Sequence, residues 1–235
     1  METIVDRTPY IETFDNGPGG WCAWGTGSLL PELNNGAFIT RSPWRVDPNH
    51  CAPGAGYLHL LAYLYTHPDY YSDEIAAEVG VNHFLAEGKD RNLTNARMTV
   101  RLRGNVDMRG ANLTLWVQAD VGDTRPNFAL TGQSLTVTPD WSEQTLLLSD
   151  DPAQWTCVGG RHDKQELYGY GDIRDALLDV NCDLILVMFP LNVVPIGIPV
   201  DMKDRLRTHR DYEPDYTYLP EGVVEFDTIQ IEYPD

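Results

Sequence analysis

The chain has 235 residues, of which 42% are hydrophobic, and a net charge of -18 from 17 basic and 35 acidic side chains. A chain of this length and composition folds into a globular structure with a sizeable core, which excludes a disordered protein. The negative charge repels the phosphates of nucleic acids and the surface of an anionic membrane, so neither is an expected partner. Neutral sugars and cations stay open as ligands.

The longest apolar run, Leu184 to Val200, is interrupted by three prolines and an asparagine. A membrane helix needs roughly 20 consecutive apolar residues, so this run is not expected to span a membrane. The first residues, Met1 to Thr3, lack the basic and apolar regions of a signal peptide. Two compartments stay open: the cytoplasm, or an extracellular or periplasmic location after removal of a signal peptide.

The four cysteines are far apart in the sequence, and no two have the CxxC spacing of a zinc ribbon. A local pairing would give two disulfides, Cys22 with Cys51 and Cys157 with Cys182. The alternative is four buried thiols in a reducing compartment. The sequence does not decide between these two states.

Short runs of alternating apolar and polar residues, bounded by Gly, Pro, Asn and Asp, predict half-buried strands. One of these runs, Leu184–Phe189, is apolar on both faces, which indicates a central, covered strand. The first and last strands are expected to pair. In chain order the predicted strands are Tyr10–Phe14, Tyr57–Tyr65, Met98–Arg103, Leu113–Val121, Ser142–Leu148, Leu184–Phe189 and Val223–Tyr233.

Helix signals are few. The segment Ser72–Val79 opens with a serine followed by two acidic residues, which suits the first turn of a short helix. A second helix is expected within Gly171–Val180, with Asp172 as its cap. The charged, tyrosine-rich segment from Asp201 to Pro220 is interpreted as a long loop. Many strands and few helices predict one all-β domain over residues 1–235, a two-sheet antiparallel β-sandwich of the jelly-roll kind.

One predicted sheet face gathers the residue types that sugars need. Aromatic rings stack on the apolar face of a pyranose, while arginine and glutamine supply directed hydrogen bonds, and two nearby arginines favour an acidic sugar. The alternative is that the arginines pair with acids and the aromatics pack beneath a loop. The predicted ligand-binding residues, drawn from three strands, are Tyr57, His59, Tyr63, Arg101, Arg103, Trp116 and Gln118.

The two ends of the chain resemble a known group of proteins. An early strand with carboxylates, Tyr10–Asp15, precedes a Gly- and Trp-rich segment, and the last strand, Val224–Ile231, holds an aspartate within an apolar alternation. This pattern resembles the galactose-binding-like β-sandwiches, which include many carbohydrate-binding modules. The resemblance implies sugar binding and a structural calcium ion held by Glu12 and Asp227, with Asp15 completing the site; calcium takes six to eight oxygen ligands. The alternative is that Asp227 accepts a backbone hydrogen bond.

A polysaccharide lyase is the second hypothesis, because a loop after Trp155 contains His162 and is followed by Tyr168 and Tyr170. A lyase removes a proton beside a carboxylate that a cation neutralises. His59 or His162 would be the base, Tyr168 or Tyr170 the acid, and Arg101 the cation. A glycoside hydrolase would need two facing carboxylates, and 35 acids leave that choice open.

The first hypothesis is therefore a carbohydrate-binding β-sandwich that recognises an oligo- or polysaccharide, with a structural calcium ion. The alternatives are an enzyme acting on a polysaccharide, and an interaction domain that forms homo-oligomers through an exposed apolar sheet face.

Overall fold

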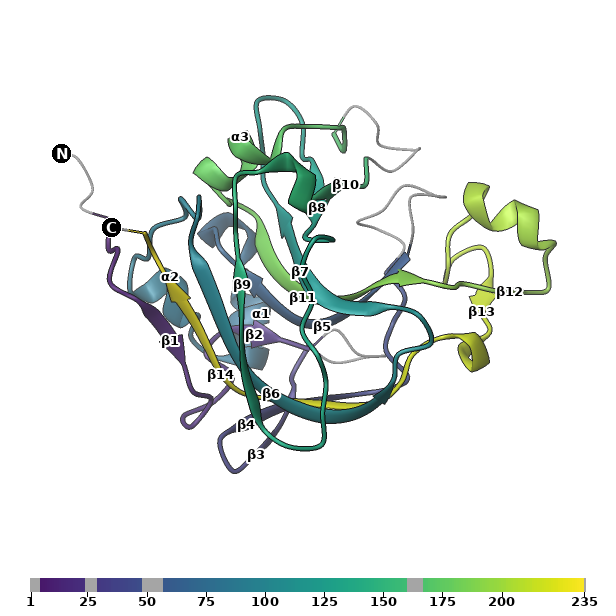
Figure 1. Ribbon diagram of the computed structural model, residues 1–235, viewed down its shortest axis with the longest axis horizontal. Coiled ribbons are helices and arrows are strands. Elements are labelled where there is room, and N and C mark those ends of the chain that lie inside the picture. The colour runs from purple at the N-terminus through teal and green to yellow at the C-terminus, as the bar shows by residue number, and fades with distance from the viewer. Residues whose placement is uncertain (1–4, 24–28, 48–56, 160–166, 235) are drawn as a thin grey trace.

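The computed structural model describes residues 5–23, 29–47, 57–159 and 167–234. Within this part of the chain two large antiparallel sheets pack face to face (Figure 1), which confirms the predicted all-β sandwich. Sheet 1 has the strand order β3 (Glu32–Asn34), β4 (Ala37–Arg41), β14 (Glu221–Glu232), β6 (Arg97–Asp107) and β9 (Ser142–Leu147), with β1 (Tyr10–Glu12) also on β14. Sheet 2 has the order β10 (Thr156–Cys157), β8 (Asn127–Ala129), β7 (Asn112–Gln118), β11 (Asp183–Leu191), β5 (Tyr57–Tyr65) and β2 (Trp21–Cys22). A small pair, β12 (Pro195–Ile196) and β13 (Glu213–Pro214), lies at one end.

The strand order confirms two predictions about position. The apolar strand β11 lies between β5 and β7, so both of its faces are covered, as its composition indicated. The first strand, β1, pairs with the last, β14, with Tyr10 opposite Ile231 and Glu12 opposite Ile229. Sheet 1 therefore holds both ends of the described chain.

The two predicted helices are present and begin where their caps indicated. Helix α1 (Asp73–Val79) is capped by Ser72, and α3 (Ile173–Leu178) by Asp172, whose carboxylate accepts from the Arg174 backbone N–H. A third helix, α2 (His83–Ala86), is too short for its periodicity to be visible in the sequence. The remaining helical turns are 3-10: η1 (Pro68–Tyr70), η2 (Pro152–Gln154), η3 (Val200–Arg205) and η4 (Tyr216–Tyr218).

The segment from Asp201 to Pro220 is more ordered than the predicted loop. It holds most of η3, all of β13 and η4, and Asp215 caps η4 by accepting from the Thr217 backbone N–H. The interpretation as one long loop is therefore wrong, because short helical turns and a two-residue strand leave no periodic apolar pattern in the sequence.

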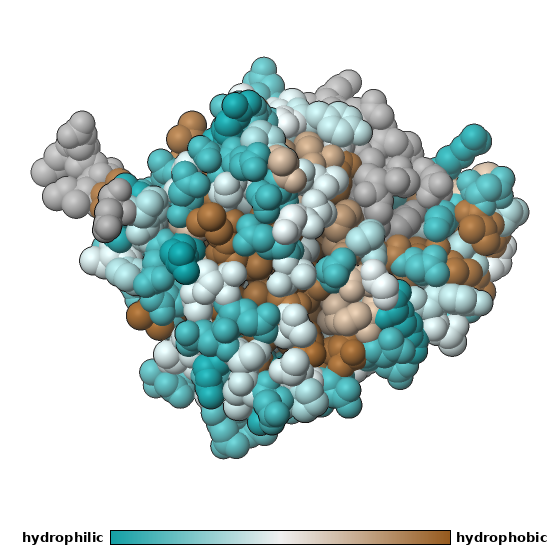
Figure 2. Space-filling model, in the orientation of Figure 1, coloured by the Kyte–Doolittle hydropathy of each residue, from teal (hydrophilic) through white to brown (hydrophobic). Residues whose placement is uncertain are grey.

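The main core fills the space between the two sheets. Its largest fully buried side chains include Trp21 and Trp44, and also Phe38 and Phe226 from sheet 1, whose rings contact each other. Hydrophilic residues cover most of the surface in the view of Figure 2, with hydrophobic residues visible between them. No helix in the described ranges is long and apolar enough to cross a membrane.

A β-bulge in β5 decides which of its side chains face the core. Leu186 lies opposite Ala62 and Val187 opposite Leu60, so Leu61 is an extra residue in β5. Before the bulge, even-numbered residues face outward from the sandwich, and after it odd-numbered residues do. His59 therefore lies on the core side, against the Trp44 ring, whereas Tyr63 lies on the outer side.

The outer face of sheet 2 carries a second hydrophobic layer, called here the outer cluster. Helix α1 covers part of this layer with Val79 and the partly buried Ile75. Sheet 2 is thus apolar on both faces, whereas sheet 1 carries charged side chains on its outer face. The outer cluster comprises Cys22, Leu58, Leu60, Tyr63, Val79, Trp116, Ala129, Val158, Ile185, Val187 and Phe189.

Candidate functional site

The residues predicted to form one sugar-binding face lie on three different surfaces. Arg101 and Arg103 belong to β6 in sheet 1, whereas Trp116 and the others belong to sheet 2. Within sheet 2, His59 faces the core because the bulge reverses the alternation of β5. The prediction of one shared face is therefore wrong. Tyr57 begins β5, and its side chain lies outside the described structure.

The two arginines are engaged with acids on the neighbouring strand. Arg101 pairs with Asp227 at 2.5 Å and Arg103 with Glu225 at 2.8 Å. Both guanidinium groups also lie over the Trp141 ring, at 5.0 and 4.5 Å from its centroid. This arrangement is the alternative that the sequence left open, in which the arginines stabilise the outer face of sheet 1.

Three of the predicted residues do meet, on the outer face of sheet 2. Across the sheet Tyr63 lies opposite Ile185, and Ile185 opposite Trp116. The next row along the strands is polar, and Gln118 belongs to it. This row, called here the polar row, consists of Tyr65, Asp183, Gln118 and Asn127.

Hydrogen bonds tie the polar row to its surroundings. The Tyr63 hydroxyl donates to Asp183 Oδ2 at 2.7 Å, and the Gln118 amide donates to Asn127 Oδ1. Asp183 is only 2% exposed, and burial followed by the nearby Asp183 charge raises the pKa of Tyr63. Burying a carboxylate costs free energy unless hydrogen bonds satisfy it. The Tyr63 hydroxyl, which donates to Asp183, therefore stabilises this face of the sheet.

Trp116 lies beside the polar row and is fully buried. Its indole Nε1 has no hydrogen-bond partner within the described structure. A buried donor without an acceptor costs about 1–3 kcal/mol. The Phe189 ring packs against the indole in a T-shaped arrangement, with 6.2 Å between the two centroids. The prediction that Trp116 lies on a sheet face open to a sugar is wrong, because its side chain is buried among the other residues of the outer cluster.

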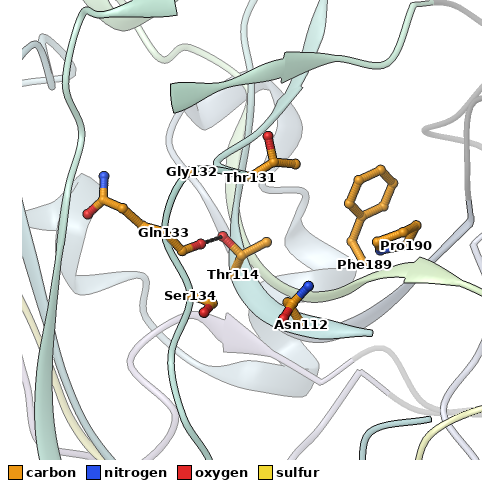
Figure 3. A pocket seen from close by; sticks show the side chains of 8 residues that line it. All are labelled: Asn112, Thr114, Thr131, Gly132, Gln133, Ser134, Phe189 and Pro190. Atoms are coloured by element: carbon orange, nitrogen blue, oxygen red, sulfur yellow. Dashed lines mark hydrogen bonds between the residues drawn. The ribbon is translucent and has the colours of Figure 1, made fainter. Parts of the chain in front are cut away.

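Phe189 also lines an open pocket of about 280 Å3 at the beginning of β7 and the end of β11. In Figure 3, Phe189 and Pro190 lie on one side of the pocket and residues 131–134 on the other, with Thr114 between them. The Thr114 hydroxyl donates to two backbone carbonyls, at 2.7 and 3.0 Å. The lining residues are Asn112, Thr114, Thr131, Gly132, Gln133, Ser134, Phe189 and Pro190.

The polar side chains that line the pocket are all uncharged. Asn112, Thr131 and Ser134 are exposed, whereas the Gln133 side chain bonds to the backbone of Leu147 and points away. An aromatic ring next to amide and hydroxyl groups can contact both the C–H groups and the hydroxyl groups of a sugar. Sequence reasoning missed this pocket because its walls come from loops and strands far apart in the chain.

The residues of the lyase hypothesis are not brought together. His59 is buried in the core, while Arg101 lies on the outer face of sheet 1. Tyr170 is 79% exposed, Tyr168 is half-buried, and His162 lies outside the described residues. Among the described members of the set, no base, acid and cation share a surface.

The three residues predicted to bind calcium point in different directions. Glu12 is buried, accepts from the Phe14 backbone N–H at 3.1 Å and contacts His83 Nδ1 at 2.8 Å. Asp227 pairs with Arg101 on the outer face, and Asp15 accepts from the Thr13 hydroxyl. No group of three or more His, Cys, Asp or Glu side chains suited to a metal is found in the described ranges. Calcium binding stays a prediction, which melting curves with and without a chelator would test.

The cysteines described by the structure are thiols. Cys22, Cys157 and Cys182 are free, so the predicted pairing of Cys157 with Cys182 is wrong. Burial raises the pKa of Cys22 to about 12 and also raises that of Cys182. Cys51, the predicted partner of Cys22, lies outside the described residues.

No protein-family model matches this sequence, and no curated protein matches it. Three solved structures are similar at TM-scores below 0.5. One is the L4b domain of human laminin alpha-2, with a TM-score of 0.30, 6% identity and 62% of each chain covered, which is less than two thirds of that domain.

The second belongs to work on endo-acting O-glycanases with which prominent members of the human gut microbiota initiate mucin breakdown; its TM-score is 0.36, with 12% identity over 96% of this chain and 99% of that one. The third is a native glycosidic hydrolase, with a TM-score of 0.37, 13% identity and 99% of each chain covered. Similarity at this level assigns the chain to no family.

Proposed function

We propose that this protein binds a carbohydrate in the pocket between Phe189 and residues 131–134. The observation that carries the proposal is the composition of that pocket, where one aromatic ring faces hydroxyl and amide groups. Its volume of about 280 Å3 lies at the lower end of ligand-binding pockets, which suits a single sugar unit at the end of a longer chain.

The ligand is a neutral sugar. None of the residues lining the pocket is charged, and the arginines that would have favoured an acidic sugar are paired with Asp227 and Glu225 on the other sheet. The net charge of -18 also disfavours the approach of a polyanion. The sequence-based expectation of an acidic sugar is therefore replaced by that of a neutral one.

Changes at the pocket rim should weaken sugar binding. Asn112→Ala removes an exposed amide, and the loss of one hydrogen bond should raise the Kd about 5- to 10-fold. Ser134→Trp should fill the pocket and abolish binding. A glycan array would identify the ligand, and isothermal titration calorimetry would measure the Kd.

The matched control is Asn105→Ala, which removes an exposed amide from β6 on the other sheet and should leave the Kd unchanged. Wild-type affinity in both pocket variants would show that the sugar binds elsewhere, and a wild-type protein that retains no glycan would refute the proposal. Release of shorter sugars from a bound polysaccharide would instead identify an enzyme.

A further inference from the structure

Trp116 differs from the other buried tryptophans in the described structure. The indole N–H of Trp21 donates to the Tyr10 hydroxyl, that of Trp44 to the Thr40 hydroxyl and that of Trp155 to the Ser149 carbonyl, each within 2.9 Å. Trp116 is as deeply buried, yet its N–H has no partner. Since buried polar groups are normally satisfied, an unsatisfied one in a folded protein needs an explanation.

The position of Trp116 supplies that explanation. Thr114, two residues earlier on the same face of β7, lines the pocket, and two residues along a strand span roughly 6.6 Å. The Phe189 ring contacts the Trp116 indole and is itself part of the pocket wall. The described residues of the outer cluster around Trp116 are largely apolar, so they offer no side-chain acceptor to its N–H.

We infer that Trp116 is an inner binding residue of the pocket and donates its indole N–H to a hydroxyl or acetamido oxygen of the bound sugar. The sugar reaches it when the Phe189 ring turns aside. Beyond Trp116 lies the polar row, in which the buried Gln118 amide donates to Asn127 Oδ1. This inference rests on the proposed function and names the residue that recognises the second sugar unit.

Trp116→Phe tests the inference because it removes the N–H and keeps an aromatic ring. The probes are four neutral disaccharides: cellobiose, maltose, lactose and N,N′-diacetylchitobiose. For whichever of these the wild-type protein binds, Trp116→Phe should raise the Kd about 10-fold, the effect of losing one hydrogen bond to a ligand. Binding should also change the tryptophan fluorescence of the wild-type protein, and Trp116→Phe should remove that change.

The matched control is Trp21→Phe, which removes the paired N–H of a tryptophan on the core side of sheet 2. This control should keep the wild-type Kd and the fluorescence response. If Trp116→Phe melts well below the working temperature, Phe189→Ala serves instead. By removing the ring that lines the pocket and contacts the Trp116 indole, it should speed association of the same disaccharide severalfold.

Two outcomes would overturn the inference. If Trp116→Phe binds within twofold of the wild type while Asn112→Ala binds more weakly, the pocket stands and Trp116 has no part in it. If the wild-type protein binds none of the four disaccharides, the inference that Trp116 recognises a second sugar unit is refuted. The glycan array then tests separately whether the pocket binds a sugar.

Discussion

His59→Leu should abolish much of the loss of stability that the wild-type protein shows in mild acid. Burial, and then the nearby His209, lowers the pKa of His59 to about 3 in the folded state. In the unfolded chain a histidine has a pKa of about 6.5. Below pH 6.5 the imidazole is protonated in the unfolded state but stays neutral in the folded state. The contribution of His59 to the free energy of unfolding is therefore complete above pH 6.5 and declines as the pH falls toward about 3.

Between the two pKa values, the size of the effect follows from how far the pH lies below the unfolded-state pKa of about 6.5. At pH 4.5 the wild-type protein should have lost about 3 kcal/mol of unfolding free energy through this group, at 1.36 kcal/mol for each pH unit. Both ring nitrogens of His59 also lack hydrogen-bond partners within the described structure, so leucine should stabilise the protein at pH 7 as well.

Urea unfolding at pH 7.0 and 4.5 would measure both effects. The acidic side chains titrate in the wild type and in the variant alike, so the difference between the two proteins isolates His59. Met188→Leu, which changes the core residue opposite His59 in β11, is the control and should keep the wild-type dependence on pH. An equal loss of stability in His59→Leu would show that the imidazole takes up its proton without unfolding.

Gly104→Ala should destabilise the protein by about 3 kcal/mol, the upper range for overpacking a core. A Cβ atom at this position would lie 2.2 Å from the Val223 carbonyl oxygen and 2.8 Å from a methyl group of Val137. The first contact is with backbone in the long β6–β14 pairing, which cannot move aside without breaking the ladder. Thermal or urea unfolding would measure the loss.

Gly88→Ala is the matched control for this prediction. Gly88 has a φ of +65°, and nothing lies within 4 Å of the added Cβ, so alanine should cost only about 1–2 kcal/mol of backbone strain. If Gly104→Ala lowers the free energy of unfolding no more than Gly88→Ala does, β6 and β14 can move apart more readily than their close approach implies.

The sequence predicted β1, β5, β6, β7, β9, β11 and β14, because each of these strands shows an apolar pattern of its own, and it missed the other strands, which are only two to five residues long. The segment Tyr57–Tyr65 was placed to the residue, and the helix caps Ser72 and Asp172 were found from their local chemistry. These features depend on neighbours a few residues away. They would have been visible in any fold that contained them.

The candidate site was predicted only in part because it depends on contacts between distant segments. Arg103 and Trp116 lie close together in sequence, yet β6 and β7 belong to different sheets. Asp183 precedes an apolar run, and its place in the polar row is visible only when the strand register sets it between Tyr65 and Gln118. The apolar pattern within a strand does not show which other strands will lie beside it in a sheet.

The bulge at Leu61 decides which side chains of β5 face outward. Because the bulge absorbs Leu61, the strand places leucines outward in its first half and the Tyr63 phenol outward in its second half. Deletion of Leu61 would make Leu60 and Ala62 consecutive, opposite Val187 and Leu186, and regular alternation would then keep Leu60 and Tyr63 on the outer face without a bulge. Leu61 is therefore the position at which β5 can lose a residue with the least change of register.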